Sequence, residues 1–113
     1  MSEIEGERSP EEAVAGLISL LDLEPLEVNL FRGTNPNTWP GGRLFGGLVA
    51  AQSLRAAIDT VDVPHYIHSF HGYFLRPGRQ GAPIVFQADR IRDGRSFTTR
   101  RVTGIVLLLV TVP

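Results

Sequence analysis

One stretch constrains the fold of this 113-residue chain more than any other, residues 44–78. It contains the glycine pair Gly46-Gly47, an apolar run from Leu48 to about Val61, and the aromatic and histidine-rich segment His65–Leu75. Five apolar residues recur in the run at helical spacing and predict one stripe facing a core: Ala50, Leu54, Ala57, Ile58 and Val61. Small residues beside this stripe predict that a sheet approaches closely. We therefore expect a central helix that is covered on most sides.

The segment His65–Leu75 is predicted to be a strand buried on both faces. Alternate residues of a strand point to opposite faces of the sheet. Tyr66, His68 and Phe70 would share one face, while His65, Ile67 and His71 would share the other. Both faces are largely apolar, so both are expected to be covered.

The remaining elements precede and follow this unit. Ser9-Pro10-Glu11-Glu12 is typical of a helix start and predicts an amphipathic helix to about Asp22. Alternation predicts further strands at Leu26–Phe31, Pro83–Arg92 and Ser96 to about Val106. Asp93-Gly94 favours a tight type I′ hairpin turn between the last two.

A polar loop, Arg32–Arg43, separates the first strand from the central helix. It contains Trp39, which is interpreted as a packing anchor, with a gate over a pocket as the alternative. Helix followed by consecutive antiparallel strands is an α+β pattern. We expect one domain, residues 1–113, with a curved antiparallel sheet wrapped around the central helix.

Composition excludes several kinds of site. The chain has no cysteine, which excludes disulfides and thiolate metal sites, and its eleven basic residues are all arginine, which excludes lysine chemistry. A formal net charge of −1 predicts no general attraction to nucleic acid. The longest apolar run, Ile105–Val110, is far shorter than the roughly 18 residues of a membrane span. We therefore expect neither a nucleic-acid nor a membrane partner.

The candidate residues for chemistry are histidines, glycines and arginines. His68 and His71 would point to opposite strand faces, which argues against a shared metal ion, and for each a buried histidine bonded to a backbone carbonyl remains the alternative. Gly46-Gly47 before a helix would offer N–H groups to a phosphate or carbonyl, or simply allow close packing. Five arginines near the last hairpin would grip phosphates or form a solvated surface: Arg90, Arg92, Arg95, Arg100 and Arg101.

From residue 30 onward the chain resembles the N-terminal half of the type II acyl-CoA thioesterases, the TesB-like family. The matching motifs occur in order and span most of the chain: Leu30–Gly33, Phe45–Gly47, Ala51–Leu54, His68–His71, Tyr73–Gly78, Arg92–Phe97 and Arg100–Val102. Leu48 departs from the glutamine that is usual after the glycine pair. The apolar tail Gly104–Pro113 also departs from the family pattern, as a truncated or frameshifted copy would. An uncharged β-prone tail of this kind favours self-association.

The resemblance implies a hotdog fold and hydrolysis of acyl-CoA to fatty acid and CoA, without a cofactor or a metal. The family's aspartate, threonine and glutamine that activate water belong to a second hotdog domain, for which this chain has no counterpart. What carries over is His68 as a catalytic candidate and Gly46, Gly47 and Gln52 as substrate-binding candidates.

Three functions are therefore left open. The first is a thioesterase-like half, weak or inactive alone, that forms a homodimer or higher oligomer in the cytoplasm. The second is an active homodimeric thioesterase in which Asp59, His68 and Gln52 supply base and orientation. The third is a non-catalytic domain that binds acyl-CoA or only dimerises.

Overall fold

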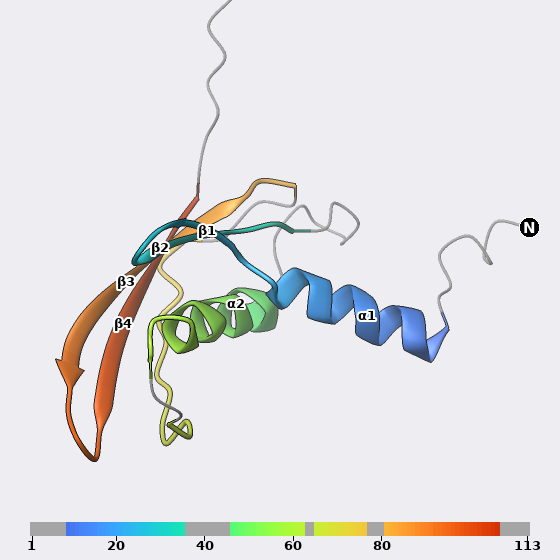
Figure 1. Cartoon of the computed structure of the whole chain (residues 1–113). Helices are drawn as coiled ribbons and strands as arrows, with labels where there is room; N and C mark the ends of the chain where they lie inside the picture. The colour runs from blue at the N-terminus through green and yellow to red at the C-terminus, as the bar shows by residue number, and fades with distance from the viewer. Residues whose placement is uncertain (1–8, 36–45, 63–64, 77–80, 107–113) are drawn as a thin grey trace, which may run out of the picture.

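A four-stranded antiparallel sheet and two helices make up the part of the chain that the computed structural model describes, residues 9–35, 46–62, 65–76 and 81–106 (Figure 1). In chain order the elements are α1 (Pro10–Leu21), β1 (Glu24–Glu27), β2 (Leu30–Gly33), α2 (Gly46–Ile58), β3 (Ile84–Asp93) and β4 (Thr98–Val106). The strands are hydrogen-bonded in the order β1-β2-β3-β4. This arrangement confirms the predicted α+β class.

The first strand differs from its prediction. Residues 26–31 were expected to form one strand, but β1 and β2 are two short antiparallel strands joined by a turn at Val28-Asn29. The hairpin lets Phe31 enter the core opposite Phe86. It also brings Arg32 onto Glu24, whose carboxylate accepts bonds of 2.7 and 3.0 Å from the guanidinium. Periodicity alone did not reveal the turn because the sequence there contains neither glycine nor proline.

The two long strands β3 and β4 confirm their predictions. Ile84, Phe86 and Ala88 alternate along β3 and are all buried, as the pattern indicated. The connection is not the predicted two-residue type I′ turn, because Gly94 lacks the positive φ that such a turn needs. Instead the four residues 94–97 join the strands, and the N–H of Gly94 donates to the carbonyl of Phe97 (2.9 Å). A Cβ on Gly94 would lie 2.5 Å from that carbonyl oxygen, so the close approach requires glycine.

α1 begins as the sequence predicted. The Ser9 side chain caps it by accepting a bond from the N–H of Glu12 (3.1 Å), and Pro10 occupies the first turn. None of its residues is buried, however, and its apolar side chains Val14, Leu17 and Ile18 are exposed. Figure 1 shows α1 projecting away from the sheet beyond the end of α2. Its apolar face is therefore uncovered along most of its length.

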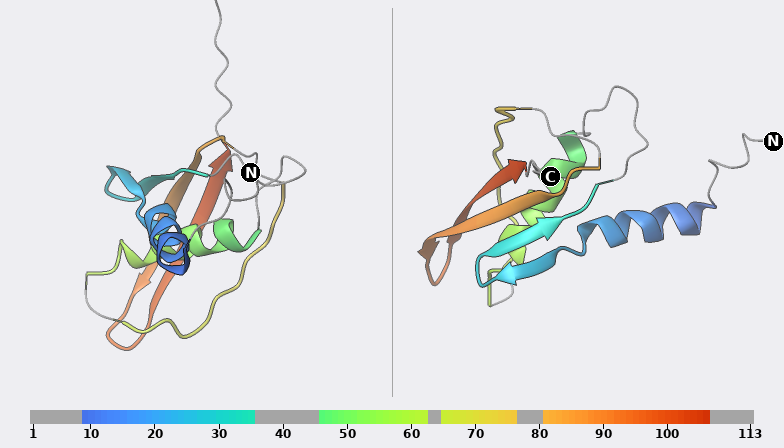
Figure 2. Two further views of the ribbon diagram at one scale, coloured as in Figure 1. Left: turned by 90° about the vertical axis from the view of Figure 1, so that its right-hand side faces the viewer. Right: turned by 90° about the horizontal axis from the view of Figure 1, so that it is seen from above.

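α2 confirms the predicted central helix but presents a different face to the core. The buried residues are Leu48, Gln52 and Ala56, spaced four apart. The predicted stripe from Ala50 to Val61 is wrong, since Ile58 is exposed and its other members are only half-buried. α2 packs against one face of the sheet, as the two views of Figure 2 show. The helix also contacts α1, and only Gly47, Arg55 and Ile58 among its residues are exposed, so the expectation of cover on most sides is confirmed.

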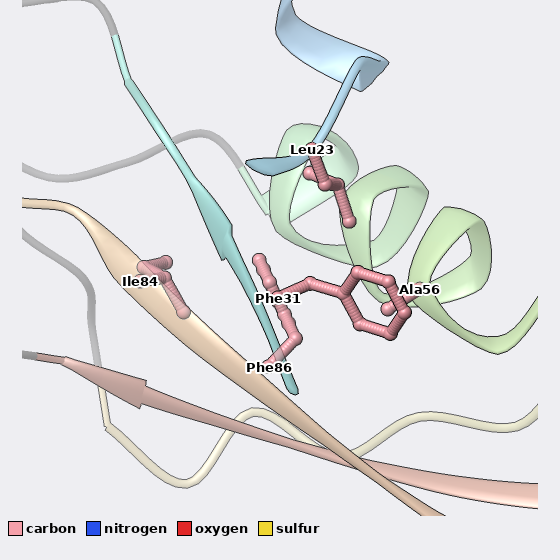
Figure 3. Close-up of a cluster of buried hydrophobic side chains, with 5 residues drawn as sticks. All are labelled: Leu23, Phe31, Ala56, Ile84 and Phe86. Atoms are coloured by element: carbon pink, nitrogen blue, oxygen red, sulfur yellow. The ribbon is translucent and has the colours of Figure 1, made fainter. Parts of the chain in front are cut away.

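The core lies between that face of the sheet and α2. It joins side chains from the α1–β1 connection, β2, β3 and α2 (Figure 3): Leu23, Phe31, Ala56, Ile84 and Phe86. Val49 and Val102 pack against it from its margin. Phe86 and Ala56 are 0% exposed. The small side chain of Ala56 lets α2 pack closely on the cluster that contains Phe31 and Phe86.

The largest departure from prediction concerns residues 65–75. No strand forms there, and every residue from 65 to 76 is exposed, including Tyr66, Tyr73 and Leu75. A strand needs a neighbour for its N–H and C=O groups, and the described residues offer this segment none. Figure 2 shows it as an irregular trace outside the sheet. The predicted burial of both faces is therefore wrong.

Several other expectations concern residues that the structure does not describe. Trp39 and most of the predicted loop lie outside the described residues, as does the tail from 107 to 113. Among the described residues, neither helix has the length and apolar character that would let it cross a membrane.

Candidate functional site

The predicted glycine pair lies at the N-terminus of α2. Gly46 is the first residue of the helix and Gly47 is exposed beside it. The ring of Phe74 covers Gly46, since a Cβ added there would lie 3.3 Å from its Cζ atom. The first N–H groups of a helix have no intrahelical partner and favour carbonyl oxygens or anions. This end of α2 therefore presents the N–H groups of a helix start next to an exposed phenylalanine, as the prediction requires.

Gln52 lies on the buried side of α2 and joins three elements. Its Nε2 donates to the carbonyl of Leu20 in α1 (2.9 Å) and to the carbonyl of Thr34 after β2 (3.0 Å). Its Oε1 is buried without a hydrogen-bond partner. A Cβ on Gly33 would lie 2.9 Å from the same amide, so glycine at the end of β2 makes room for it. The contacts of Gln52 are those of a structural brace between α1, α2 and β2.

His68 is exposed and contacts the β3–β4 connection. Its ring meets that of Phe97 edge to face, with centroids 5.9 Å apart and planes at 78°. Nearby, Nε2 of His65 lies 3.5 Å from Oγ1 of Thr98. His71 is exposed as well. The alternative of buried histidines is therefore wrong for both His68 and His71.

Asp59 follows the last turn of α2 and pairs with Arg55, four residues earlier (3.0 Å). The described hydrogen bonds include none between Asp59 and His68. At about 1.5 Å per residue, Asp59 lies roughly 20 Å along the helix axis from Gly46. His68 contacts the end of the sheet that Arg100 ties to Thr60, which is also the far end of α2. The structure thus separates the glycine pair from both proposed catalytic side chains.

The arginines near the hairpin are largely engaged within the chain. Arg101 pairs with Asp89 (3.1 Å), and Nε of Arg90 donates to Oδ1 of Asn29 (2.9 Å). Arg100 has a side chain only 5% exposed and contacts Asp93 at 2.6 Å. The sequence predicted Arg100 as one of the candidate phosphate ligands. Its inward contact with Asp93 could not be predicted from the spacing of nearby residues.

Arg100 connects β4 to Thr60, just beyond the C-terminal end of α2. Its Nε donates to Oγ1 of Thr60 (2.7 Å) and its Nη2 to the carbonyl of Thr60 (3.2 Å). A cation beside the last carbonyls of a helix is favoured by the helix dipole. A bulge at Ile91 shifts the register of β3, so that Asp93 comes onto the same face as Arg100. No group of three potential metal ligands occurs in the ranges that the structure covers.

Comparisons with known proteins agree with the sequence resemblance. The model of the acyl-CoA thioesterase N-terminal domain matches residues 35–112, which includes the tail expected to depart from the family. Human acyl-coenzyme A thioesterase 8 is 42% identical over 88 residues, which are 77% of this chain and 27% of that protein. Acyl-CoA thioesterase 2 of Haemophilus influenzae is 40% identical over 90 residues, 79% of this chain and 31% of that protein. This chain thus spans about a third or less of these relatives.

Solved structures give the same result for the fold. Acyl-CoA thioesterase II TesB2 from Mycobacterium marinum superposes with a TM-score of 0.69 at 50% identity, over 79% of this chain and 33% of that one. The tesB protein MAP1729c of Mycobacterium avium subspecies paratuberculosis also gives 0.69, at 28% identity, over 88% of this chain and 45% of that one. These neighbours confirm the expected hotdog-type fold. The chain belongs to the family of acyl-CoA thioesterase N-terminal domains.

Proposed function

We propose that this chain is a thioesterase-like half that binds acyl-CoA and, by itself, hydrolyses it weakly or not at all. The observation that carries the proposal is the separation of the candidate groups. Gly46 and Gly47 lie at the start of α2. Asp59 lies one residue past its other end and is paired with Arg55 of the last turn. Hydrolysis needs a base within hydrogen-bond reach of a water placed at the thioester carbonyl, beside donors for the developing oxyanion. Within the described residues no such constellation is assembled.

The binding part of the proposal rests on the N-terminus of α2. The N–H groups at the helix start, Gly46 and Gly47, suit a thioester carbonyl, and the exposed ring of Phe74 offers an apolar surface beside them. Gln52 contributes indirectly, since it fixes this part of α2 against Thr34 and Leu20. We assign it a positioning role, with the acyl-CoA contacts left to the two glycines and Phe74. The setting we propose is cytoplasmic fatty acid metabolism, by family resemblance.

A thiol-release assay with a medium-chain acyl-CoA tests the activity. We expect turnover far below that of ordinary enzymes, which is about 1–1000 per second. The Haemophilus influenzae acyl-CoA thioesterase 2 serves as the positive control under the same conditions. Turnover of this chain within the ordinary range would overturn the proposal of weak hydrolysis.

An active homodimer is the second candidate, favoured by the exposure of His68. His68 is exposed although its ring touches Phe97, so residues of another copy can reach it. On this reading Asp59 and His68 supply the base and its orientation, so that His68→Ala and Asp59→Ala each lower turnover at least tenfold. Unchanged turnover in both variants would exclude these roles.

Binding without hydrolysis is the third candidate, and a thermal-shift titration combined with the thiol-release assay separates it from an active homodimer. A non-hydrolysing binder gains stability as acyl-CoA is added, because the ligand binds only the folded state. Gly47→Val introduces a branched side chain at the proposed carbonyl site on the exposed side of the helix start, and we expect it to weaken this shift. Val14→Ala on the distant face of α1 is the matched control and should leave the shift unchanged.

A further inference from the structure

Two exposed arginines at the hairpin tip, residues 92–98 between β3 and β4, take no part in the ion pairs of this hairpin. Arg100 and Arg101 each bind an aspartate of β3. In the part of the chain that the structure describes, the side chains of Arg92 and Arg95 are exposed and have no ion-pair partner. A guanidinium group without an internal partner can bind a phosphate through two parallel N–H groups.

The hairpin is positively charged although the whole chain is slightly negative. Residues 89–101 contain five arginines and two aspartates, a formal net charge of +3 in a chain of −1. Both aspartates are already paired with arginines. Outside the described residues, acidic side chains occur only at positions 3, 5 and 7 of the sequence. An anion that approaches the hairpin tip therefore meets an excess of positive charge.

Arg92 lies against the connection that joins the two strands. A Cβ on Gly94 would be 3.1 Å from Nε of Arg92 and 2.5 Å from the carbonyl oxygen of Phe97. Glycine at this position thus leaves room for the guanidinium as well as for the turn. Arg95 belongs to the same connection. The two unpaired arginines therefore flank one short stretch of backbone.

An exposed aromatic ring lies on the same connection. Phe97 is 62% exposed, although the ring of His68 meets it edge to face at 5.9 Å. Exposed aromatic rings stack on nucleobases, and arginines beside them bind the phosphates of the same nucleotide. The combination favours a phosphorylated nucleoside over a simple anion.

One exposed segment joins the hairpin tip to the start of α2. His68 contacts Phe97, and six residues later Phe74 covers Gly46. Figure 2 shows this segment passing from the hairpin toward the start of α2. The helix between the two places is roughly 20 Å long. In a CoA thioester, the pantetheine arm and the diphosphate likewise hold the adenosine far from the carbonyl, so one such molecule suits both places.

We propose that the hairpin tip binds the 3′-phosphoadenosine end of CoA, with Arg92 and Arg95 on its phosphates and Phe97 against the adenine. The proposal rests on the proposed function, because it assigns the nucleotide end of the acyl-CoA whose thioester end lies at Gly46 and Gly47. Phosphate contacts to exposed arginines are screened by salt.

Isothermal titration calorimetry with three probes tests which end of CoA is held. CoA should bind, and dephospho-CoA, which lacks the 3′-phosphate, should bind at least about fivefold more weakly. Pantetheine, which lacks the nucleotide, should bind more weakly than either. Raising the NaCl concentration from about 50 to about 500 mM should weaken the binding of CoA. Equal affinities for the three probes, or an affinity for CoA that salt does not change, would overturn the proposal.

Single substitutions locate the site. Arg92→Gln and Arg95→Gln should each weaken the binding of CoA at least about fivefold. Arg32→Gln is the charge-matched control, since Arg32 lies beside the start of β3, at the other end of the hairpin, and should leave the affinity unchanged. Phe97→Ala should weaken adenosine 3′,5′-bisphosphate and leave inorganic pyrophosphate unaffected. Far-UV circular dichroism should match the unmodified chain in all four variants, because the substitutions lie on the surface.

Equal losses in the Arg92, Arg95 and Arg32 variants would show an effect of net charge alone and would overturn the site. Unchanged affinity in the Arg92 and Arg95 variants would also overturn it.

Gly47→Val separates this proposal from the proposed function. It alters the thioester end only, so the affinity for adenosine 3′,5′-bisphosphate should stay unchanged while the thermal shift with acyl-CoA falls. A fall in the affinity for adenosine 3′,5′-bisphosphate would overturn the placement of the nucleotide at the hairpin tip. An unchanged acyl-CoA shift in this variant would instead contradict the thioester site and leave the nucleotide site standing.

Discussion

Two regions of this molecule carry large apolar side chains, but only one of them is buried. Between α2 and the sheet, Phe31, Ile84 and Phe86 are buried together. Along residues 65–76, the side chains of Tyr66, Phe74 and Leu75 are exposed. The difference lies in hydrogen-bonding partners, because β2 and β3 pair with each other while residues 65–76 have no strand beside them in the part of the chain that the structure describes. Apolar pattern therefore decides burial only where a neighbouring strand is available.

The largest effect is expected from the centre of the buried region. Phe86→Ala removes a fully buried ring and should cost about 3–5 kcal/mol, a large part of the 5–15 kcal/mol of a typical domain. Urea denaturation followed by circular dichroism measures the loss. Phe97→Ala, a matched change at an exposed ring on the connection 94–97, should cost less than about 1 kcal/mol. Equal losses in the two variants would contradict the assignment of Phe86 to the core and of Phe97 to the surface.

Arg100 tests how the far end of α2 is held to the sheet. Arg100→Met keeps much of the apolar stem but removes the bonds to Thr60 and Asp93, and should cost about 2–3 kcal/mol. Arg101→Met is the control, since its pair with Asp89 is exposed and worth less than about 1 kcal/mol. Comparable urea midpoints for the two variants would contradict the role given to Arg100.

Substitutions at Gly33 and Gln52 test the contact that joins α2 to α1 and to the end of β2. Gly33→Ala places a Cβ 2.9 Å from the Gln52 amide and should cost about 1–2 kcal/mol, because overpacked side chains must shift. In a Gln52→Ala background the clash is gone, so the same substitution should cost less. A double-mutant cycle measures this coupling. Additive losses would show that the amide of Gln52 does not occupy the space above Gly33.

The smallest effect is expected on the exposed face of α1. Leu17 is 52% exposed, so Leu17→Ser should change the free energy of unfolding by about 0.5 kcal/mol or less. The control is Leu23→Ser, which places a hydroxyl in the core and should cost several times more. A large loss for Leu17→Ser would mean that the apolar face of α1 is covered in solution.

The sequence indicated the strands β3 and β4 and both helices because their signals are local. Ser9 is a cap whose partner is three residues away, and Ile84, Phe86 and Ala88 alternate on one strand. Prediction from the sequence failed where the local structure depends on residues far away in the chain. Residues 65–75 have the pattern of a strand but no partner strand among the described residues, and the inward turn of Arg100 depends on Thr60, forty residues away.

The candidate site was predictable to the same extent. The position of Gly46 and Gly47 at a helix start follows from local sequence and is observed. The brace formed by Gln52 depends on carbonyls of α1 and β2, which no spacing within α2 reveals. The contact of His68 with Phe97 likewise joins residues that only the fold brings together.

Amide hydrogen exchange of the native chain tests whether a hydrogen-bonded core coexists with a segment, residues 65–76, that is not part of the described sheet. The account predicts strong protection in β3 around Phe86 and in α2 around Ala56, and exchange near the unprotected rate from Tyr66 to Leu75. Protection of residues 66–75 equal to that of β3 would contradict the account.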